Sequence, residues 1–263
     1  MISALDVSVR FGRREVVKSV ELKASAKGIT AIIGPNGSGK TSLLRALSGE
    51  VSYSGDVTIN SLEVKGTPAW RLASERAVLP QFSNVTFPFT VREIISLGII
   101  AKSQRVAGAA ENTLPERALA KVGLSDFCGR RYHELSGGEQ QRVQFARVLA
   151  QVWEPVLDGI PRWLFLDEPI SSLDIQHQLT IMNIARDFAK SGGGVVAILH
   201  DLNLAAMYAD QIVLMKDGEI LSDGTPQKVL TNALLKKAFD CDLKVGKVPT
   251  KDQKFILPQT AQL

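Results

Sequence analysis

The stretch Ile29-Thr30-Ala31-Ile32-Ile33-Gly34-Pro35-Asn36-Gly37-Ser38-Gly39-Lys40-Thr41 decides the fold of this 263-residue chain. Its first five residues form a nearly continuous apolar run, which is typical of a parallel strand covered on both faces. The next eight match a phosphate-loop pattern, in which two glycines five positions apart precede Lys and Thr. A helix is expected to begin at Lys40, because three leucines follow at helical spacing. Strand, loop and helix together predict an α/β core.

The loop residues are the first candidate binding site. Glycines allow the backbone amides to point at phosphate oxygens, and the start of the helix adds its positive end. Lys40 is expected to reach the β- and γ-phosphates of a nucleotide, and the Thr41 hydroxyl to ligate Mg²⁺. The candidate nucleotide-binding residues of this loop are Gly34, Pro35, Asn36, Gly37, Ser38, Gly39, Lys40 and Thr41.

Two further apolar runs, Trp163 to Leu166 and Val195 to Leu199, have the same buried-strand pattern. The first ends on Asp167-Glu168 and the second on His200. In open α/β sheets, ligands bind beyond the carboxyl ends of the strands, so these polar residues are expected to meet the phosphate loop at one edge.

The two acids have different expected roles. Asp167 is expected to hold Mg²⁺, through water, and Glu168 to polarise the water that attacks the nucleotide. Considered without the phosphate loop, the pair has a structural alternative, an acidic helix cap before Pro169.

The octapeptide Leu135-Ser136-Gly137-Gly138-Glu139-Gln140-Gln141-Arg142 lies between the phosphate loop and the acids. It places Ser136, Gly137 and Gly138 at a helix start, where bare amides form a second anion site. Without its context this is often only a helix cap. One chain cannot easily wrap two such sites around one γ-phosphate, so a second copy of the chain is the natural supplier.

The rest of the pattern adds smaller elements. Alternating residues from Leu5 to Leu22, with Val57 to Asn60, predict an N-terminal antiparallel β-subdomain. Apolar residues at three- and four-residue spacing over 90–155 predict helices. A hairpin turning at Asp217-Gly218 and one helix from Pro226 to Phe239 are expected near the end.

The predicted fold class is therefore α/β, a P-loop NTPase core with a mostly parallel sheet and helices on both faces. We expect a single domain over 1–263. Its ATP-binding core and β-subdomain would comprise 1–89 and 156–263, and 90–155 would form an inserted helical subdomain.

Composition excludes several other classes of protein. Hydrophobic residues make up 45% and charged residues 22% of the chain, which is typical of a globular protein. The net charge of +4 is spread over scattered residues, so no nucleic-acid partner is expected. Cys128 and Cys241 lack metal-ligand spacing and are expected to be free thiols. No apolar run is long enough to span a membrane and no leader follows Met1, so a cytosolic protein is expected.

In their order along the chain, these motifs resemble the nucleotide-binding subunit of ATP-binding-cassette (ABC) transporters. The resemblance covers about residues 2–240 and is carried by Phe11, Gly34–Thr41, Gln81, Leu135–Arg142, Trp163–Glu168, Ser171-Ser172-Leu173-Asp174 and His200. It implies a head-to-tail homodimer with two ATPs, each held between one subunit's phosphate loop and the other's Ser136–Gly138.

The resemblance also implies roles that the residues alone do not. Phe11 would stack on adenine, although the family more often has Tyr there, and Gln81 would sense Mg²⁺ and relay to the permease. Asp174 would couple the two ATP sites, and His200 would contact the γ-phosphate. The structural alternatives are a core aromatic for Phe11, a surface loop residue for Gln81 and a core histidine for His200.

Two departures from the common family pattern narrow the resemblance. The loop from Gln151 to Arg162 is longer than usual, and Ile170 replaces the more usual Thr. The long loop, together with Ser171-Ser172-Leu173-Asp174 and the dense Phe82, Phe87 and Phe89 segment, is similar to the heme (hemin) importer branch. That branch is similar to the siderophore and vitamin B12 importers. The three phenylalanines would form a groove for a permease helix. Alternatively, they would simply pack in the core.

This resemblance implies a peripheral ATPase at the cytoplasmic face of the inner membrane. Its implied partners are a separate permease dimer and, through the permease, a substrate-binding protein. Import of a ferric siderophore or vitamin B12 stays an alternative, and so does an exporter. A DNA-repair ATPase is disfavoured because Lys40 and Ser136 leave no room for a long coiled coil, and a translation ATPase because there is one cassette. A non-catalytic subunit is disfavoured because Lys40 and Glu168 are both present.

Overall fold

The computed structural model describes residues 1–81, 85, 87–100, 112–249 and 253–261. Its central element is a six-stranded sheet in the order β12-β11-β3-β10-β9-β6. Neighbouring strands are parallel, except for the antiparallel β11–β12 pair. The strands are β3 (Ile29–Ile33), β6 (Arg76–Leu79), β9 (Trp163–Asp167), β10 (Gly194–Ile198), β11 (Gln211–Lys216) and β12 (Glu219–Gly224). The predicted α/β class and the parallel pairing of the three apolar runs are confirmed.

Successive residues of the central strands face two different cores, which explains why these strands are apolar throughout. In β9, Leu164 and Leu166 belong to one hydrophobic cluster, whereas Trp163 and Phe165 belong to the other. All five residues of β9 are buried, as are all five of β3 and of β10. Burial on both faces anchors the strand ends from which the polar residues emerge.

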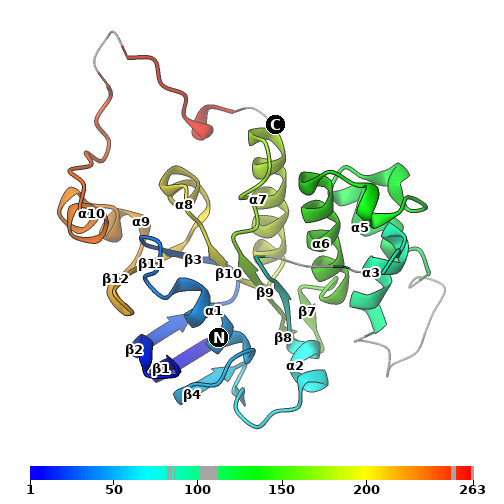
Figure 1. The fold of residues 1–263 in the computed structure, drawn as a ribbon, viewed down its shortest axis with the longest axis horizontal. Helices are drawn as coiled ribbons and strands as arrows, with labels where there is room; N and C mark the ends of the chain where they lie inside the picture. Colours follow the sequence, from blue (N-terminus) through cyan, green and yellow to red (C-terminus); the bar gives the residue numbers. More distant parts are fainter. Residues whose placement is uncertain (82–84, 86, 101–111, 250–252, 262–263) are drawn as a thin grey trace.

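One face of the sheet is covered by α1 (Lys40–Ser48) and by a second, antiparallel sheet in the order β2-β1-β4-β5. Figure 1 shows this second sheet in blue and cyan around the N-terminus. Its strands are β1 (Ile2–Phe11), β2 (Arg14–Ala24), β4 (Ser54–Ile59) and β5 (Leu62–Glu63). The expected N-terminal hairpin and its pairing with the strand near Val57 are confirmed.

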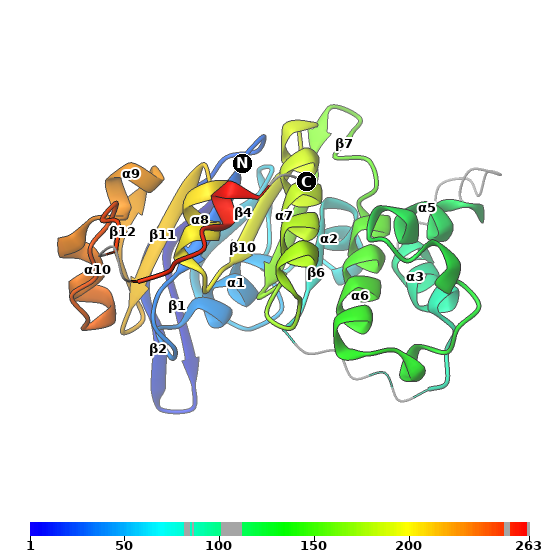
Figure 2. The same cartoon turned by 90° about the horizontal axis from the view of Figure 1, so that it is seen from above.

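The other face carries most of the helices, with α7 and α8 over the sheet and α6 beside them (Figure 2). The helix α6 packs on α3 and α5, which lie farther from the sheet. Bounds of the helical elements up to α8 are α2 (Ala69–Glu75), α3 (Val91–Ile100), α5 (Leu114–Lys121), η1 (Ser125–Phe127), η2 (Tyr132–Glu134), α6 (Gly137–Gln151), α7 (Ile175–Lys190) and α8 (Leu202–Tyr208).

Two segments differ from the expectation. The single helix expected over 226–239 is wrong, because the chain forms α9 (Pro226–Val229) and α10 (Asn232–Phe239) instead. Thr231 breaks the run, since its hydroxyl caps α10 by accepting a hydrogen bond from the Leu234 amide at 3.3 Å. A short helix η3 (Pro258–Thr260) follows and packs on α8.

The long loop before β9 is not wholly irregular. It contains a small hairpin of β7 (Val156–Leu157) and β8 (Ile160–Pro161). Asp158 and Gly159 both have positive φ, 51° and 78°, as a two-residue hairpin turn requires. The Asp-Gly dipeptide is the sequence signal that would have predicted this hairpin.

Candidate functional site

The loop between β3 and α1 is held in a conformation that requires glycine. Gly34 and Gly39 have φ of 150° and 98°. A Cβ at Gly34 would lie 2.2 Å from the Met215 carbonyl oxygen, and one at Gly39 would lie 2.4 Å from that of Val16. No side chain fits at such distances, because the strands β11 and β2 lie directly against the loop.

Lys40 is almost fully buried at the first position of α1. Its ammonium donates to the carbonyl oxygens of Gly34 and Pro35, at 3.0 and 2.9 Å. Burial lowers the pKa of this ammonium group, while the nearby Glu168 and Asp167 carboxylates oppose the shift. The cation therefore spans the loop and lies inside it, where a phosphate would meet it.

Thr41 and Asp167 come from different elements and are brought together. The Thr41 hydroxyl donates to Asp167 Oδ1 at 3.1 Å. Asp167 is 1% exposed, and its other oxygen, Oδ2, finds no hydrogen-bond partner among the described residues. Burial raises the pKa of this carboxyl group. The Ser38 hydroxyl is likewise buried without a described partner.

The buried oxygens of Asp167 and Ser38 that lack a partner indicate whether the site suits ATP and Mg²⁺. A carboxylate and a hydroxyl are the hard oxygen ligands that Mg²⁺ takes, usually one or two from protein and the rest from phosphate and water. The described residues contain no cluster of three His, Cys, Asp or Glu side chains that would hold a metal on its own. The donor set therefore fits a magnesium ion that arrives with a nucleotide.

Glu168 and His200 form the second pair. They follow the ends of the adjacent strands β9 and β10, and Glu168 Oε1 lies 2.7 Å from His200 Nε2. His200 is exposed, which excludes the core-histidine alternative. Glu168 has a φ of 52°, a left-handed conformation that a non-glycine residue adopts only when its surroundings impose it.

One cleft of about 670 Å³ brings together eight of the expected site residues. A cavity of this size is within the range of cofactor sites. Its lining residues are Arg14, Val16, Asn36, Gly37, Gly39, Lys40, Thr41, Ser42, Gln81, Glu168 and His200. Gln81, which follows β6, is therefore a cleft residue and not only a surface loop residue.

Three lining residues, Arg14, Val16 and Ser42, were not expected from the sequence. Ser42 follows Thr41 on the first turn of α1. Arg14 is paired with Phe11 across the β1–β2 hairpin. That pairing follows from the short turn at Gly12-Arg13. The hairpin expected at this turn was therefore the sequence signal that could have placed Arg14 beside Phe11.

The remaining expected residues do not line this cleft. Phe11 is 54% exposed at the end of β1, which excludes the core-aromatic alternative. Asp174 is exposed and caps α7, where the His177 amide donates to it at 2.9 Å. Hydrogen bonds from this amide and from the His177 ring hold the pKa of Asp174 below its usual range.

Ser136 and Gly137 are also exposed, at the N-terminus of α6. The Ser136 hydroxyl and the Glu139 side chain form a reciprocal capping box. Gly138 is only partly covered. Within one chain, the residues expected to bind a nucleotide are thus divided between the cleft and an outward-facing helix start.

Among the phenylalanines that suggested a permease groove, Phe82 lies outside the described residues. Phe87 is 70% exposed, whereas Phe89 packs on the core, and their ring centroids are 5.9 Å apart. Core packing thus accounts for Phe89 and not for Phe87. No helix in the described part of the chain is long and apolar enough to cross a membrane.

Comparison with known proteins gives a consistent family. The ABC transporter family model matches residues 17–171, more than half of the chain. The hemin import ATP-binding protein HmuV of Mesorhizobium japonicum is 56% identical over 261 residues, covering 99% of each chain. HmuV of Bartonella quintana is 51% identical, also covering 99% of each chain.

Solved structures agree with the fold. An ATP-binding subunit of an ABC transporter superposes with a TM-score of 0.76 at 21% identity, covering 92% of this chain and 94% of that one. A dimeric, post-hydrolysis ATP-binding cassette bound to ADP and Pi superposes with a TM-score of 0.73 at 25% identity, covering 86% and 99%.

Proposed function

Because the chain belongs to the ABC transporter family, we propose that it is the ATP-hydrolysing subunit of an importer that carries hemin through a separate permease. The observation that supports ATP hydrolysis is a cleft lined by the phosphate loop and the Glu168–His200 pair, with Asp167 hydrogen-bonded to the lining residue Thr41. The choice of hemin rests on the full-length relatives, since no residue of the cleft addresses the cargo.

Each cleft residue has a task suited to its position. The loop amides and Lys40 bind the β- and γ-phosphates. Thr41, Asp167 and Gln81 would hold Mg²⁺, which would neutralise charge on the phosphates. Glu168 takes a proton from the attacking water, and His200 orients Glu168 and contacts the γ-phosphate.

The outward-facing residues belong to the other half of the reaction. The amides of Gly137 and Gly138 lie at the start of α6 beside the Ser136 side chain, and these three residues would bind the γ-phosphate held by a second copy of the chain. Phe11 would stack on the adenine, next to the cleft residue Arg14, with which it is paired across the β1–β2 hairpin. Asp174 would link the two sites of the resulting head-to-tail homodimer.

The same proposal assigns the partners and the location. The homodimer would bind a permease dimer at the cytoplasmic face of the membrane, and through it serve a substrate-binding protein. We assign 1–89 and 156–263 to the ATP-binding core with its β-subdomain, and 90–155 to the helical subdomain.

Transport by the reconstituted complex is the direct test. The chain is combined in vesicles with the permease encoded beside its gene, and uptake of hemin, cobalamin and a ferric siderophore is measured with and without ATP. We expect ATP-dependent uptake of hemin above the other two. Glu168→Gln should reduce uptake and ATP hydrolysis by about 10²-fold or more, the range of general-base catalysis. Preference for another cargo would reject hemin, and wild-type hydrolysis by the variant would reject Glu168 as the base.

A further inference from the structure

The backbone of Glu168 needs external support. Its left-handed φ of 52° is unfavourable for a residue with a side chain and persists where neighbours impose it. Its carbonyl oxygen accepts hydrogen bonds from the Ser171 amide at 3.4 Å and the Ser171 hydroxyl at 3.3 Å. Both donors lie in the same turn, so they move with Glu168 and do not hold it against the rest of the molecule.

Gln141 of α6 supplies a third and shorter bond. Its side-chain Nε2 donates to the Glu168 carbonyl oxygen at 3.1 Å. The other end of the amide, Oε1, accepts a hydrogen bond from the Ser172 hydroxyl. Because both ends are bound, the amide has one orientation, with its N–H group directed at Glu168.

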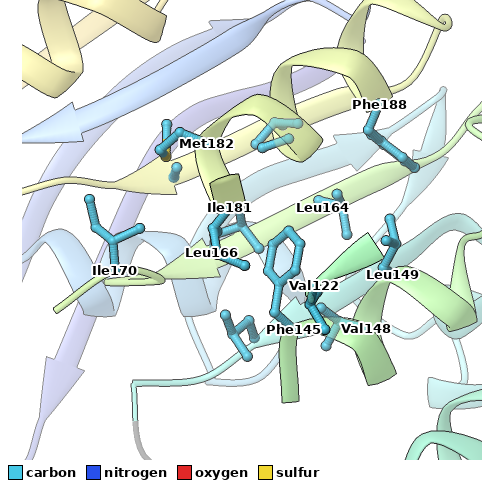
Figure 3. Close-up of a cluster of buried hydrophobic side chains, with 14 of the residues drawn as sticks. Val122, Phe145, Val148, Leu149, Leu164, Leu166, Ile170, Ile181, Met182 and Phe188 are labelled. Carbon is cyan, nitrogen blue, oxygen red and sulfur yellow. The ribbon is translucent and has the colours of Figure 1, made fainter. Parts of the chain in front are cut away.

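The helix that carries Gln141 is itself fixed against the sheet, where it packs on β6. Phe145, one turn farther along α6, is fully buried with Leu164 and Leu166 in one hydrophobic cluster. Figure 3 shows its ring directed into the core beside Leu166, the strand residue just before Asp167. Gln141 therefore extends from a rigid support to the residue that follows the strand.

The same helix begins at the outward-facing anion site. Ser136 is the cap of α6, only five positions before Gln141. A displacement of the helix start would be transmitted along α6 to the Gln141 amide, and from there to the Glu168 backbone.

We propose that Gln141 is a positioning residue for catalysis, which holds the Glu168 backbone and ties it to the helix that offers Ser136–Gly138 to the partner subunit. The inference rests on the proposed function, because it needs Glu168 as the general base. Gln141 touches neither nucleotide nor water in this role and acts through Glu168 alone.

The test compares Gln141→Met with Gln178→Met, two substitutions of equal size. Gln141→Met removes the hydrogen-bonding amide and keeps the volume. We expect kcat for ATP to fall about five- to tenfold, the loss of roughly one hydrogen bond from the transition state. The KM for ATP and the affinity for ADP should stay within about twofold, because the phosphate loop keeps its contacts.

Gln178→Met is the matched control. Gln178 of α7 donates to the carbonyl oxygens of Ile170 and Leu173 at 3.3 and 3.0 Å, so it anchors the same turn without contacting Glu168. It should change kcat less than about twofold. An equal fall in kcat for the two variants would overturn the proposal, because it would reflect general order of the turn.

Two more variants distinguish a failure of this proposal from a folding defect and from a failure of the proposed function. Ser172→Ala leaves Gln141 in place but frees its amide, and a smaller fall in kcat is expected than for Gln141→Met. In a Glu168→Gln background, Gln141→Met should have no further effect on the residual rate, whereas a full additional fall would overturn the proposal. Wild-type hydrolysis by Glu168→Gln alone would instead reject the general base itself.

Discussion

At the scale of single residues, Asp167 is the least favourably placed group of the site. It is buried at the end of β9 with one oxygen bound to Thr41 and the other without a described partner. Burial raises the pKa of its carboxyl group, so the folded protein holds the charged form at a cost. A cation delivered with the nucleotide would offset that cost, which favours tight coupling between metal and ATP.

Asp167→Asn should therefore stabilise the protein without ligand. The folded pKa lies above the unfolded one, so the wild-type loses stability as pH rises between the two values and carries the full penalty at higher pH. At pH 7.5 we expect the variant to have a higher Tm, by roughly 2 °C for about 1 kcal/mol. Differential scanning calorimetry without nucleotide measures this difference.

With added Mg²⁺ and ATP, the wild type should have the higher Tm, because the variant lacks a metal ligand. A lower Tm for the variant in the absence of ligand would contradict the account of Asp167. At lower pH, within the window between the two pKa values, the difference between the proteins should shrink.

Residue identity predicted much of the cleft. The spacing of Gly34, Gly39, Lys40 and Thr41 was sufficient to predict the phosphate loop, because such a loop is built from consecutive residues. The Glu168–His200 contact joins residues 32 positions apart (200 − 168). The hydrogen bond from Gln141 to Glu168 joins residues 27 positions apart (168 − 141). Such pairs depend on strand order and helix placement, which local patterns do not contain.

At the scale of elements, α6 links the two halves of the site. Its N-terminus carries the proposed anion site, and its buried side packs on β6 and places Phe145, Val148 and Leu149 in one core with Leu164 and Leu166 of β9 (Figure 3). The capping box at Ser136 and the buried Phe145 together fix where the helix begins and how it lies on the sheet.

Phe145→Ala should be among the most destabilising changes in this helix. The ring is fully buried in a packed core, so its removal should cost about 3–5 kcal/mol of unfolding free energy. Urea denaturation measures the loss. Phe145→Leu, which keeps most of the apolar volume, should cost about 1 kcal/mol. A cost below about 1 kcal/mol for the alanine variant would mean that α6 is not held by this contact.

The elements that were predicted correctly have strong local signals. Uninterrupted apolar runs identified β3, β9 and β10, and alternation identified β1 and β2. The split between α9 and α10 was missed because Thr231 acts as a cap in the middle of a helical pattern. Caps of this kind depend on one hydrogen bond, which periodicity does not detect.

At the scale of the whole molecule, the residues expected to bind a nucleotide are divided between two places. The cleft holds the phosphate loop and Glu168, whereas Ser136 and Gly137 face outward on α6. Under the proposed function, a second copy of the chain would complete the site, with its α6 facing the first cleft.

Glu168→Gln with Mg²⁺ and ATP should form this dimer stably, since bound ATP is not hydrolysed. Light scattering should give about 57 kDa, twice the chain mass of 28.5 kDa. Gly137→Glu in the same background is the control. A Cβ at Gly137 meets no described atom within 4 Å, so the variant should fold, but its carboxylate would repel the phosphate. A dimer of this double variant at equal ATP affinity would place the interface elsewhere.

The local sequence was sufficient for the phosphate loop, the buried strands and the ends of those strands, because each is a run of adjacent residues with one periodicity and one chemistry. The distances across the site arise from packing over the whole chain. Strand order places His200 beside Glu168, and burial of Phe145 places Gln141 beneath the Glu168 carbonyl. These contacts exist because one hydrophobic core packs α6 against the sheet while a second core covers the opposite face of the sheet, and no short segment encodes that arrangement.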